Sequence, residues 1–345
     1  MTGGDRLQVR VLHDGERIVG VTPELHRSVA GVMSLLQGRE PEQGLTLIER
    51  LFSICTHAHG VAGRRALNLA RGKAPDTEAG EHHEARLAVE RIRETALRLL
   101  TGWHFAEGDE AATRELLVLV SGLLAALSRG EAVRELQEQV GQLSGLWNGL
   151  CRDKSSLDDW IGHRAARWQG IRLGPGVPAL SPEQSAEIAR ALATDEGGHF
   201  CSAPVLSGRC YMTGPSAGLS QQRDGAQYIA GVLSALFAQV NRDILYLQQG
   251  TGAMTAEDYS SGPGVGYGWA LSARGWLLHR VVLAEEKIRK WQILAPTDWN
   301  FQGTGVLHQR LLGVEVPGHW LESLVNDLIL SVDPCVSFEV SIGHA

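Results

Sequence analysis

The chain has 345 residues, 43% hydrophobic and 21% charged, which is enough for one large hydrophobic core or two modest ones. Its 32 Lys and Arg against 39 Asp and Glu give a net charge of -7, and no long basic run occurs, which argues against nucleic acid as a partner. The N-terminus lacks the apolar core of a signal peptide, and the longest apolar stretch, residues 116–127, is short for a membrane span. We therefore expect a cytoplasmic globular protein that does not enter a membrane.

Residues 1–22 predict a β-hairpin. Apolar and polar residues alternate on both sides of Asp14 and Gly15, a dipeptide that suits a tight turn with positive φ. A helical body is expected over residues 24–250, where apolar residues recur at helical spacing. A loop at residues 38–41 separates its first two helices.

Three segments of this helical body stand out. Residues 82–100 have the pattern of an amphipathic helix. Residues 112–128 are apolar nearly all round, which predicts a helix that is buried on every side. Residues 221–249 give the longest helical pattern in the chain.

A second hairpin is expected in the C-terminal third. A glycine-rich turn precedes two β-like runs, residues 276–282 and 287–293, so turn and hairpin together occupy residues 262–300. Residues 317–345 then hold a last amphipathic helix and a cysteine motif. We expect the whole chain, residues 1–345, to form one α+β unit that is mainly α.

The cysteines and histidines supply the first candidate site. Five cysteines spread over a long chain do not predict a disulfide framework. Cys55, His57 and His59 lie within five residues, and at the start of a helix Cys55 and His59 share a face while His57 points away. Thiolate and imidazole are metal ligands, and the alternative is a buried cysteine followed by two surface histidines.

Two residues of the C-terminal third are further candidates. Cys335 follows a proline just beyond the last predicted helix, and it is either a ligand or a core residue. Arg274 precedes a glycine that lets another group approach the backbone, and a solvated arginine is the alternative. The chain has no G-x-G-x-x-G after a strand, no P-loop and no G-x-S-x-G, which removes three large enzyme classes.

Taken in order, these segments resemble the large subunit of the nickel-iron hydrogenases. In that family a G-R-x-P loop leads to the motif R-x-C-G-x-C-T-x-x-H. Here the loop at residues 38–41 leads to residues 50–59, in which Cys55 and His59 match and Phe52 stands in place of the first cysteine.

The resemblance continues to the end of the chain. The family's P-R-G loop is similar to the segment around Arg274, and its P-[ST]-x-W-N turn is similar to residues 296–300. In the family's last motif, D-P-C-x-x-C-x-x-H, Cys335 matches, while Phe338 and Ser341 replace the second cysteine and the histidine. The resemblance implies the large-subunit fold, a helical bundle with two small hairpins.

The departures from the family pattern bear on activity. The family's nickel site uses four thiolates from two C-x-x-C pairs, and Phe52 and Phe338 leave this chain with one thiol from each pair. The glutamate taken as the family's proton relay falls at Met33, which carries no titratable proton. The resemblance therefore implies a protein that binds no nickel, does not turn over hydrogen and is not an enzyme.

The resemblance retains the iron half of the family site. There, two of the thiolates also hold an iron with two cyanides and one carbon monoxide, which here implies Cys55 and Cys335 as metal ligands. Guanidinium and hydroxyl groups suit the anionic cyanide nitrogens. The further cofactor-binding residues implied by the same resemblance are His59, Arg274, Leu277, Pro296 and Thr297.

This pattern resembles accessory proteins of the HupK or HoxV type. It implies a maturation scaffold that holds or relays an Fe(CN)2(CO) fragment, with the hydrogenase large subunit and cofactor-assembly proteins as partners. Two alternatives stay open. One is a metal-free interaction protein that mimics the large subunit, and the other is a small redox or metal-dependent enzyme that uses Cys55, His57 and His59.

The hypothesis makes three geometric predictions. The sulfurs of Cys55 and Cys335 should face each other, no more than roughly 4.6 Å apart, to share one iron. Phe52 and Phe338 should pack beside them. Arg274 should be partly buried without a close carboxylate, awaiting an anionic ligand.

Overall fold

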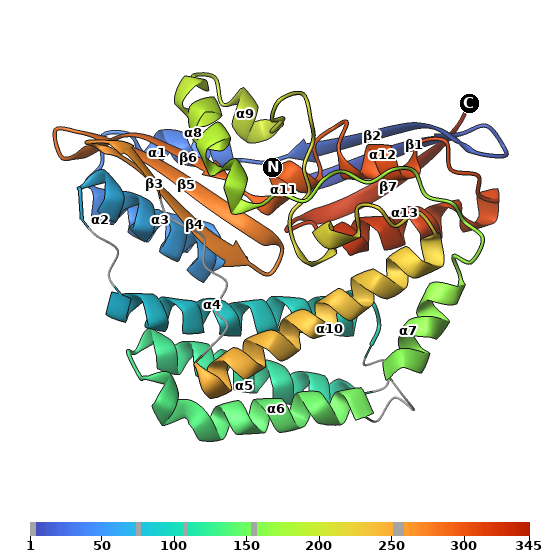
Figure 1. The fold of residues 1–345 in the computed structure, drawn as a ribbon, viewed down its shortest axis with the longest axis horizontal. Helices are drawn as coiled ribbons and strands as arrows, with labels where there is room; N and C mark the ends of the chain where they lie inside the picture. The colour runs from blue at the N-terminus through green and yellow to red at the C-terminus, as the bar shows by residue number, and fades with distance from the viewer. Residues whose placement is uncertain (1–4, 74–76, 106–108, 153–156, 251–258) are drawn as a thin grey trace.

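The computed structural model describes residues 5–73, 77–105, 109–152, 157–250 and 259–345. It confirms an α+β fold that is mainly α. Two small sheets lie side by side against a bundle that includes helices α4, α5, α6 and α10 (Figure 1).

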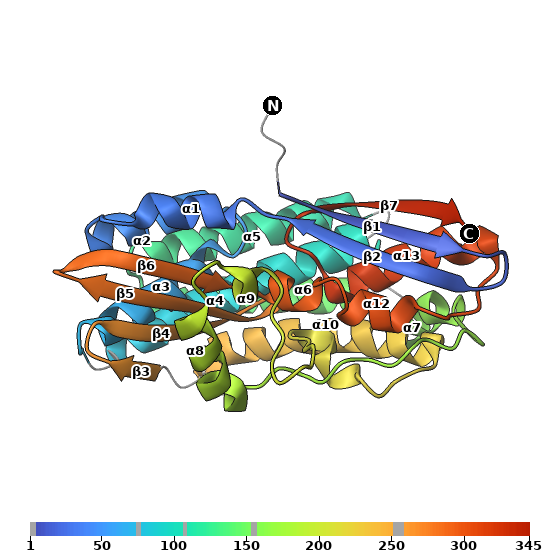
Figure 2. The same ribbon diagram turned by 90° about the horizontal axis from the view of Figure 1, so that it is seen from above.

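The first sheet joins the two ends of the chain. The predicted hairpin is present as β1 (Arg6–His13) and β2 (Ile18–His26), and the Asp14 carboxylate accepts hydrogen bonds from two backbone N–H groups of the turn. A strand that the sequence analysis did not predict, β7 (Ser337–His344), pairs in parallel with β1 and follows the cysteine motif directly (Figure 2). The order is β2-β1-β7.

The second sheet corrects the prediction of a glycine-rich turn and one hairpin. It has four antiparallel strands: β3 (Tyr259–Gly262), β4 (Val265–Ser272), β5 (Gly275–Ala284) and β6 (Lys287–Leu294).

The glycines of β4 lie within a strand because a helix approaches them closely. A Cβ on Gly266 or Gly268 would collide with backbone carbonyl oxygens of α3 (Thr56–Ala70). The glycines therefore serve helix-on-sheet packing, which sets the position of the N-terminus of α3.

The helices follow the predicted periodicity. The two expected on either side of the loop at 38–41 are α1 and α2, and the amphipathic segment becomes α4, which continues into one π-helical turn over Arg98–Gly102. The remaining helical bounds are α1 (Val29–Leu36), α2 (Pro41–Leu51), α4 (Thr77–Leu97), α5 (Glu110–Ser128), α6 (Gln137–Arg152), α7 (Leu157–Ala166), α8 (Ser185–Thr194), α9 (His199–Ser202), α10 (Gly225–Gln249), α11 (Pro296–Asn300), α12 (Val306–Leu311) and α13 (Gly318–Val332).

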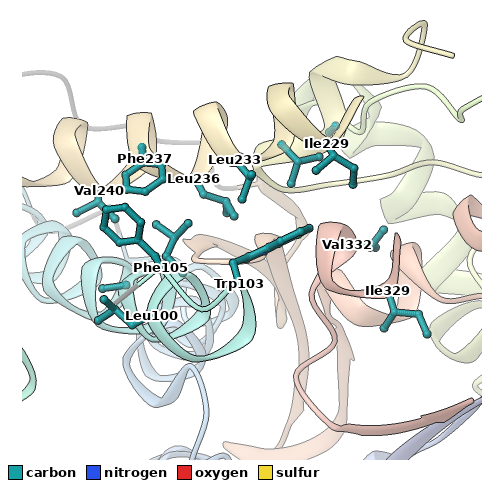
Figure 3. Packing of buried hydrophobic residues seen from close by; sticks show 14 of the residues in the cluster. Leu100, Trp103, Phe105, Ile229, Leu233, Leu236, Phe237, Val240, Ile329 and Val332 are labelled. Carbon is teal, nitrogen blue, oxygen red and sulfur yellow. The ribbon is translucent and has the colours of Figure 1, made fainter. Parts of the chain in front are cut away.

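The largest hydrophobic core lies between α4, α10 and α13. Trp103 and Phe105, just beyond α4, face the apolar side of α10, and Phe105 meets Phe237 edge to face at 4.8 Å (Figure 3). Ile329 and Val332 of α13 join the same cluster. This core fixes the end of α13, from which the chain runs to Cys335.

Helix α5 is not buried on every side, so that prediction is wrong. It lies between α4 and α6 in the bundle (Figure 1). Val118, in the middle of the helix, is 67% exposed. One face of α5 is buried against α4 and α6, while small residues such as Ser121, Gly122 and Ala125 lie on the solvent side. A nearly continuous apolar sequence therefore does not require burial on every side. By length and composition alone α5 matches a membrane span, a match that core helices of globular proteins also give.

Candidate functional site

A cavity of about 310 Å³ lies where segments from both ends of the chain meet. The start of α3, the β4–β5 turn, the start of α11 and the link from α13 to β7 form its wall. Every residue that the sequence analysis placed around an iron fragment lines this cavity: Cys55, His59, Arg274, Leu277, Pro296, Thr297 and Cys335.

Cys55 occupies a strained position at the start of α3. It precedes the first helical residue with a left-handed backbone, φ 58°, which a residue other than glycine rarely adopts. Its side chain is buried, and burial raises the pKa of the thiol well above its usual range, although the Arg274 charge partly opposes this. Cys55 is therefore a thiol, and not a thiolate, at neutral pH.

A buried carboxylate holds the first turn of α3, and the sequence analysis missed it. Glu90 of α4 accepts hydrogen bonds from the backbone N–H groups of His57 and Ala58 at 2.8 and 2.9 Å. A carboxylate suits the positive end of a helix, but burial raises the pKa of Glu90 to about 7 despite these bonds. Glu90 thereby anchors the turn that carries Cys55.

Cys335 lies on the opposite wall in a more open position. It is half-buried, and the Thr297 hydroxyl donates a hydrogen bond to its sulfur at 3.0 Å. Asp333, two residues earlier, ends α13 with a second left-handed backbone, φ 56°. Cys55 and Cys335 are both free thiols that line the same cavity, and the close approach of their sulfurs stays a prediction.

Arg274 has two carboxylate partners, so the expectation that it has none is wrong. Its Nη1 lies 3.3 Å from Glu94 Oε2, and its Nε lies 3.0 Å from Asp333 Oδ2. Nη1 also donates to the sulfur of Cys55 at 3.5 Å. Burial alone would lower the pKa of Arg274, but Asp333, Cys55 and Glu94 outweigh it and raise the pKa. Arg274 thus braces the two walls of the cavity.

The network around Arg274 carries more positive than negative charge. Asp333 also pairs with Arg98 at 3.2 Å, and Glu94 also pairs with Arg93 at 2.7 Å. Three guanidinium groups therefore share two carboxylates. Arg274 Nε is buried and makes no hydrogen bond among the described residues, although it lies within ion-pair distance of Asp333.

Arg27 is a second cation at the cavity that sequence reasoning missed. It follows β2, is almost fully buried, and pairs with Asp298 at 2.6 Å. Its Nε is buried without a hydrogen-bond partner among the described residues. Burial would lower the pKa of Arg27, but Asp298 and the nearby Cys335 raise it. No sequence motif marks Arg27, because its partner lies 271 residues away.

The two histidines near Cys55 diverge, as the helical spacing predicts. His59 lines the cavity, and its Nδ1 lies 3.0 Å from His279 Nε2. His57 turns away to Arg86, whose Nη2 lies 2.9 Å from His57 Nδ1, and desolvation lowers the pKa of His57 to about 4. Cys55, His57 and His59 therefore do not face one site, and within the described ranges no three His, Cys, Asp or Glu side chains are grouped so that they could hold a metal ion.

Comparison with known proteins places the chain in a family. No protein-family model matches the chain. It is 35% identical to the hydrogenase expression/formation protein HupK of Azotobacter vinelandii, with 100% of both chains covered. It is 36% identical to the hydrogenase expression/formation protein HupV of Azotobacter chroococcum, with 99% of both covered. The chain belongs to the HupK/HoxV family of hydrogenase expression/formation proteins. The HoxV protein of Cupriavidus necator is 26% identical over 90% of both chains.

The solved structures that resemble the chain are hydrogenases. The reduced Ni-Fe-Se hydrogenase of Desulfovibrio vulgaris Hildenborough matches with a TM-score of 0.59 and 16% identity over 94% of both chains. A glycine-to-threonine variant of the [NiFeSe] enzyme from that organism matches with a TM-score of 0.64 and 14% identity, over 96% of this chain and 98% of that one. At this level of identity the likeness shows the fold alone, which is that of the hydrogenase large subunit.

The two phenylalanines that this HupK/HoxV-family chain has in place of cysteines differ in position. Phe52 lines the cavity and stacks on His59, with ring centroids 4.0 Å apart. Phe338 is not among the described residues that line the cavity, so its predicted place beside the cysteines is wrong. It belongs to β7 opposite Leu7, because strand pairing turns its side chain toward the main hydrophobic core.

Proposed function

We propose that the protein is a non-catalytic, cytoplasmic maturation scaffold that holds or relays an Fe(CN)2(CO) fragment on Cys55 and Cys335 on its way to a hydrogenase large subunit. The observation that carries the proposal is the shared cavity, in which two thiols that are 280 residues apart in sequence face one space of about 310 Å³. A pair of thiolates suits a soft iron fragment, and the resident proton of each thiol must leave when the metal binds.

Charge at the cavity supports an anionic cargo. Cyanide ligands carry negative charge outward, and the arginine network contains one more guanidinium than carboxylate. Arg274 Nε and Arg27 Nε are buried nitrogens without a hydrogen bond among the described residues. A charged donor in a dry site binds an anion more strongly than a neutral donor does. Leu277 and Pro296 add an apolar wall that suits carbon monoxide.

The same geometry supports cargo transfer over catalysis. Phe52 fills the position next to Cys55 with a ring that cannot ligate, which supports binding of iron without nickel. A chain with the large-subunit fold also presents assembly proteins with a surface like that of their final client. Its expected partners are therefore the cofactor-assembly proteins and the hydrogenase large subunit.

Infrared spectroscopy tests the proposal, because iron-bound cyanide and carbon monoxide absorb where protein does not. The protein is isolated anaerobically after co-production with the assembly proteins. We expect cyanide and carbon monoxide bands in the wild type and in the control Cys151→Ser, whose thiol lies in α6 outside the cavity. Cys55→Ser and Cys335→Ser should each lose most of the bands.

Two results would overturn the proposal. Bands that persist in the double variant Cys55→Ser/Cys335→Ser would place the iron elsewhere. A wild-type protein that binds the assembly proteins but has neither iron nor infrared bands would be a metal-free interaction protein that mimics the large subunit.

A further inference from the structure

A chain of hydrogen bonds runs from the second sheet to the cavity. The indole Nε1 of Trp291 on β6 donates to His279 Nδ1 at 3.1 Å. His279 on β5 faces His59 on α3, with 3.0 Å between His279 Nε2 and His59 Nδ1. All three side chains are buried, and His59 lines the cavity beside Cys55.

The donor at the beginning of this chain determines the proton positions along it. An indole nitrogen only donates, so His279 Nδ1 must accept and carries no proton. Burial lowers the pKa of His279 to about 3, so the ring is neutral and its one proton is on Nε2. That proton is donated to His59 Nδ1. Because His59 Nδ1 accepts this hydrogen bond, it carries no proton of its own, and the ring proton of His59 is on Nε2.

The Nε2–H group of His59 opens on the cavity. This nitrogen has no hydrogen-bond partner in the described part of the chain. It is also not fully enclosed by protein atoms, so a ligand in the cavity can reach it. Phe52 stacks on the ring with an interplanar angle of 12°, which holds the ring plane. Gly63 allows the close packing behind it, since a Cβ there would lie 2.9 Å from the Trp291 ring.

We propose that Trp291 and His279 are positioning residues that hold His59 in its Nε2–H tautomer, so that His59 presents a hydrogen-bond donor to an acceptor atom of the cargo in the cavity. The opposite tautomer of His279 would put two donors, its Nδ1–H and the indole N–H, against each other in a dry interior. The donor role rests on the proposed function, whereas the tautomer is a property of the metal-free protein.

The tautomer is read in the metal-free protein by nitrogen-15 NMR of the histidine rings, with His59 assigned by its loss in His59→Gln. We expect the Nε2–H form of His59 to exceed the Nδ1–H form at least about tenfold. His279→Gln should keep this ratio, because the glutamine amide still donates to His59 Nδ1. His279→Leu removes the donor, and Trp291→Phe frees the His279 tautomer, so both should lower the ratio severalfold.

Trp299→Phe is the matched control. Trp299 is as buried as Trp291, but its Nε1 has no partner among the described residues, so the substitution removes similar volume and no hydrogen bond. It should leave the His59 ratio unchanged. If His279→Leu fails to fold, the ratio of His59 tautomers in the wild type and in Trp291→Phe still tests the proposal. An Nδ1–H form of His59 in the wild type, or a ratio unchanged in Trp291→Phe, overturns the proposal.

The infrared bands of the iron-loaded protein test the donor role separately. A cyanide or carbon monoxide band should shift in His279→Leu relative to the wild type and to His279→Gln. Identical bands alongside a changed tautomer would overturn the donor role. A protein without iron would fail the proposed function while leaving the tautomer result intact.

Discussion

The two walls of the cavity hold their cysteines in opposite ways. Cys55 is buried at the start of α3 on a strained backbone, and a buried carboxylate fixes the helix turn that follows it. Cys335 is half-buried in the link from α13 to β7, where one hydroxyl donates to its sulfur. The Cys55 wall is preorganised and dry, whereas the Cys335 wall is accessible. The proposed cargo site requires both properties, because an iron fragment would have to enter and then be held away from water.

Arg274 connects the two walls. It contacts Cys55 directly and pairs with Asp333, which ends the helix that leads to Cys335. One side chain therefore links the two walls through direct contacts. The comparison between the walls can be tested by breaking this brace first and then perturbing each wall separately.

Breaking the brace should have the largest effect. Arg274→Leu leaves Glu94 and Asp333 without one of their cationic partners in a buried site, which should lower the free energy of unfolding by about 3 to 5 kcal/mol. Chemical denaturation measures the change. Arg129→Leu is the control, because its pair with Glu131 is largely exposed and should cost less than about 1 kcal/mol. Equal stability of Arg274→Leu and wild type would show that the walls are held by packing alone.

Acid should weaken the Cys55 wall next. Burial lowers the folded-state pKa of His279 from 6.5 to about 3, so the unfolded chain binds a proton that the folded chain excludes. The stabilisation is complete above pH 6.5 and is lost as the pH falls toward 3. Between pH 6.5 and 5 the loss should be about 2 kcal/mol from this residue.

Denaturant titrations at several pH values measure this loss. In His279→Gln the chain should bind one proton fewer when it unfolds. The free energy of unfolding should therefore fall less steeply below pH 6.5 than in the wild type. Superimposable profiles of wild type and His279→Gln would contradict a neutral, buried His279 behind the Cys55 wall.

The elements of the Cys55 wall were largely predictable from local pattern. Helical spacing gave the helix after Cys55 and the separation of His57 from His59, because both depend on neighbours within one turn. The Cys335 wall depends on pairing between chain ends. Strand β7 was missed although Phe338, Val340 and Ile342 alternate with polar residues, because its partner strand lies more than 300 residues earlier.

The motif residues could be predicted to share one site, but their charge partners could not. Glu90 and Glu94 lie on an amphipathic helix, where a carboxylate normally faces water. They are buried because the α3 backbone and Arg274 arrive from distant parts of the chain to pair with them. The sequence therefore predicts an Arg274 without a carboxylate partner, whereas in the structure it pairs with Glu94 and Asp333.

Thiol modification should distinguish the walls directly. In the native protein Cys335 should react with iodoacetamide at least about tenfold faster than Cys55, because burial raises the pKa of the Cys55 thiol and limits access to it. Peptide mass spectrometry over a time course measures both rates. The difference should disappear in denaturant, which controls for intrinsic reactivity. Equal native rates would mean that the Cys55 wall opens as readily as the Cys335 wall.

The smallest effect should come from the strained backbone of Cys55. Cys55→Gly and Cys55→Ala both remove the thiol, but only glycine adopts a positive φ without steric cost, so the glycine variant should be more stable by about 1 kcal/mol. At Ala58, inside α3, alanine should instead be more stable than glycine, and Ala58→Gly should lower the free energy of unfolding by about 1 kcal/mol. Thermal or chemical unfolding measures both differences. If Cys55→Gly is no more stable than Cys55→Ala, the left-handed backbone at Cys55 does not destabilise the folded protein.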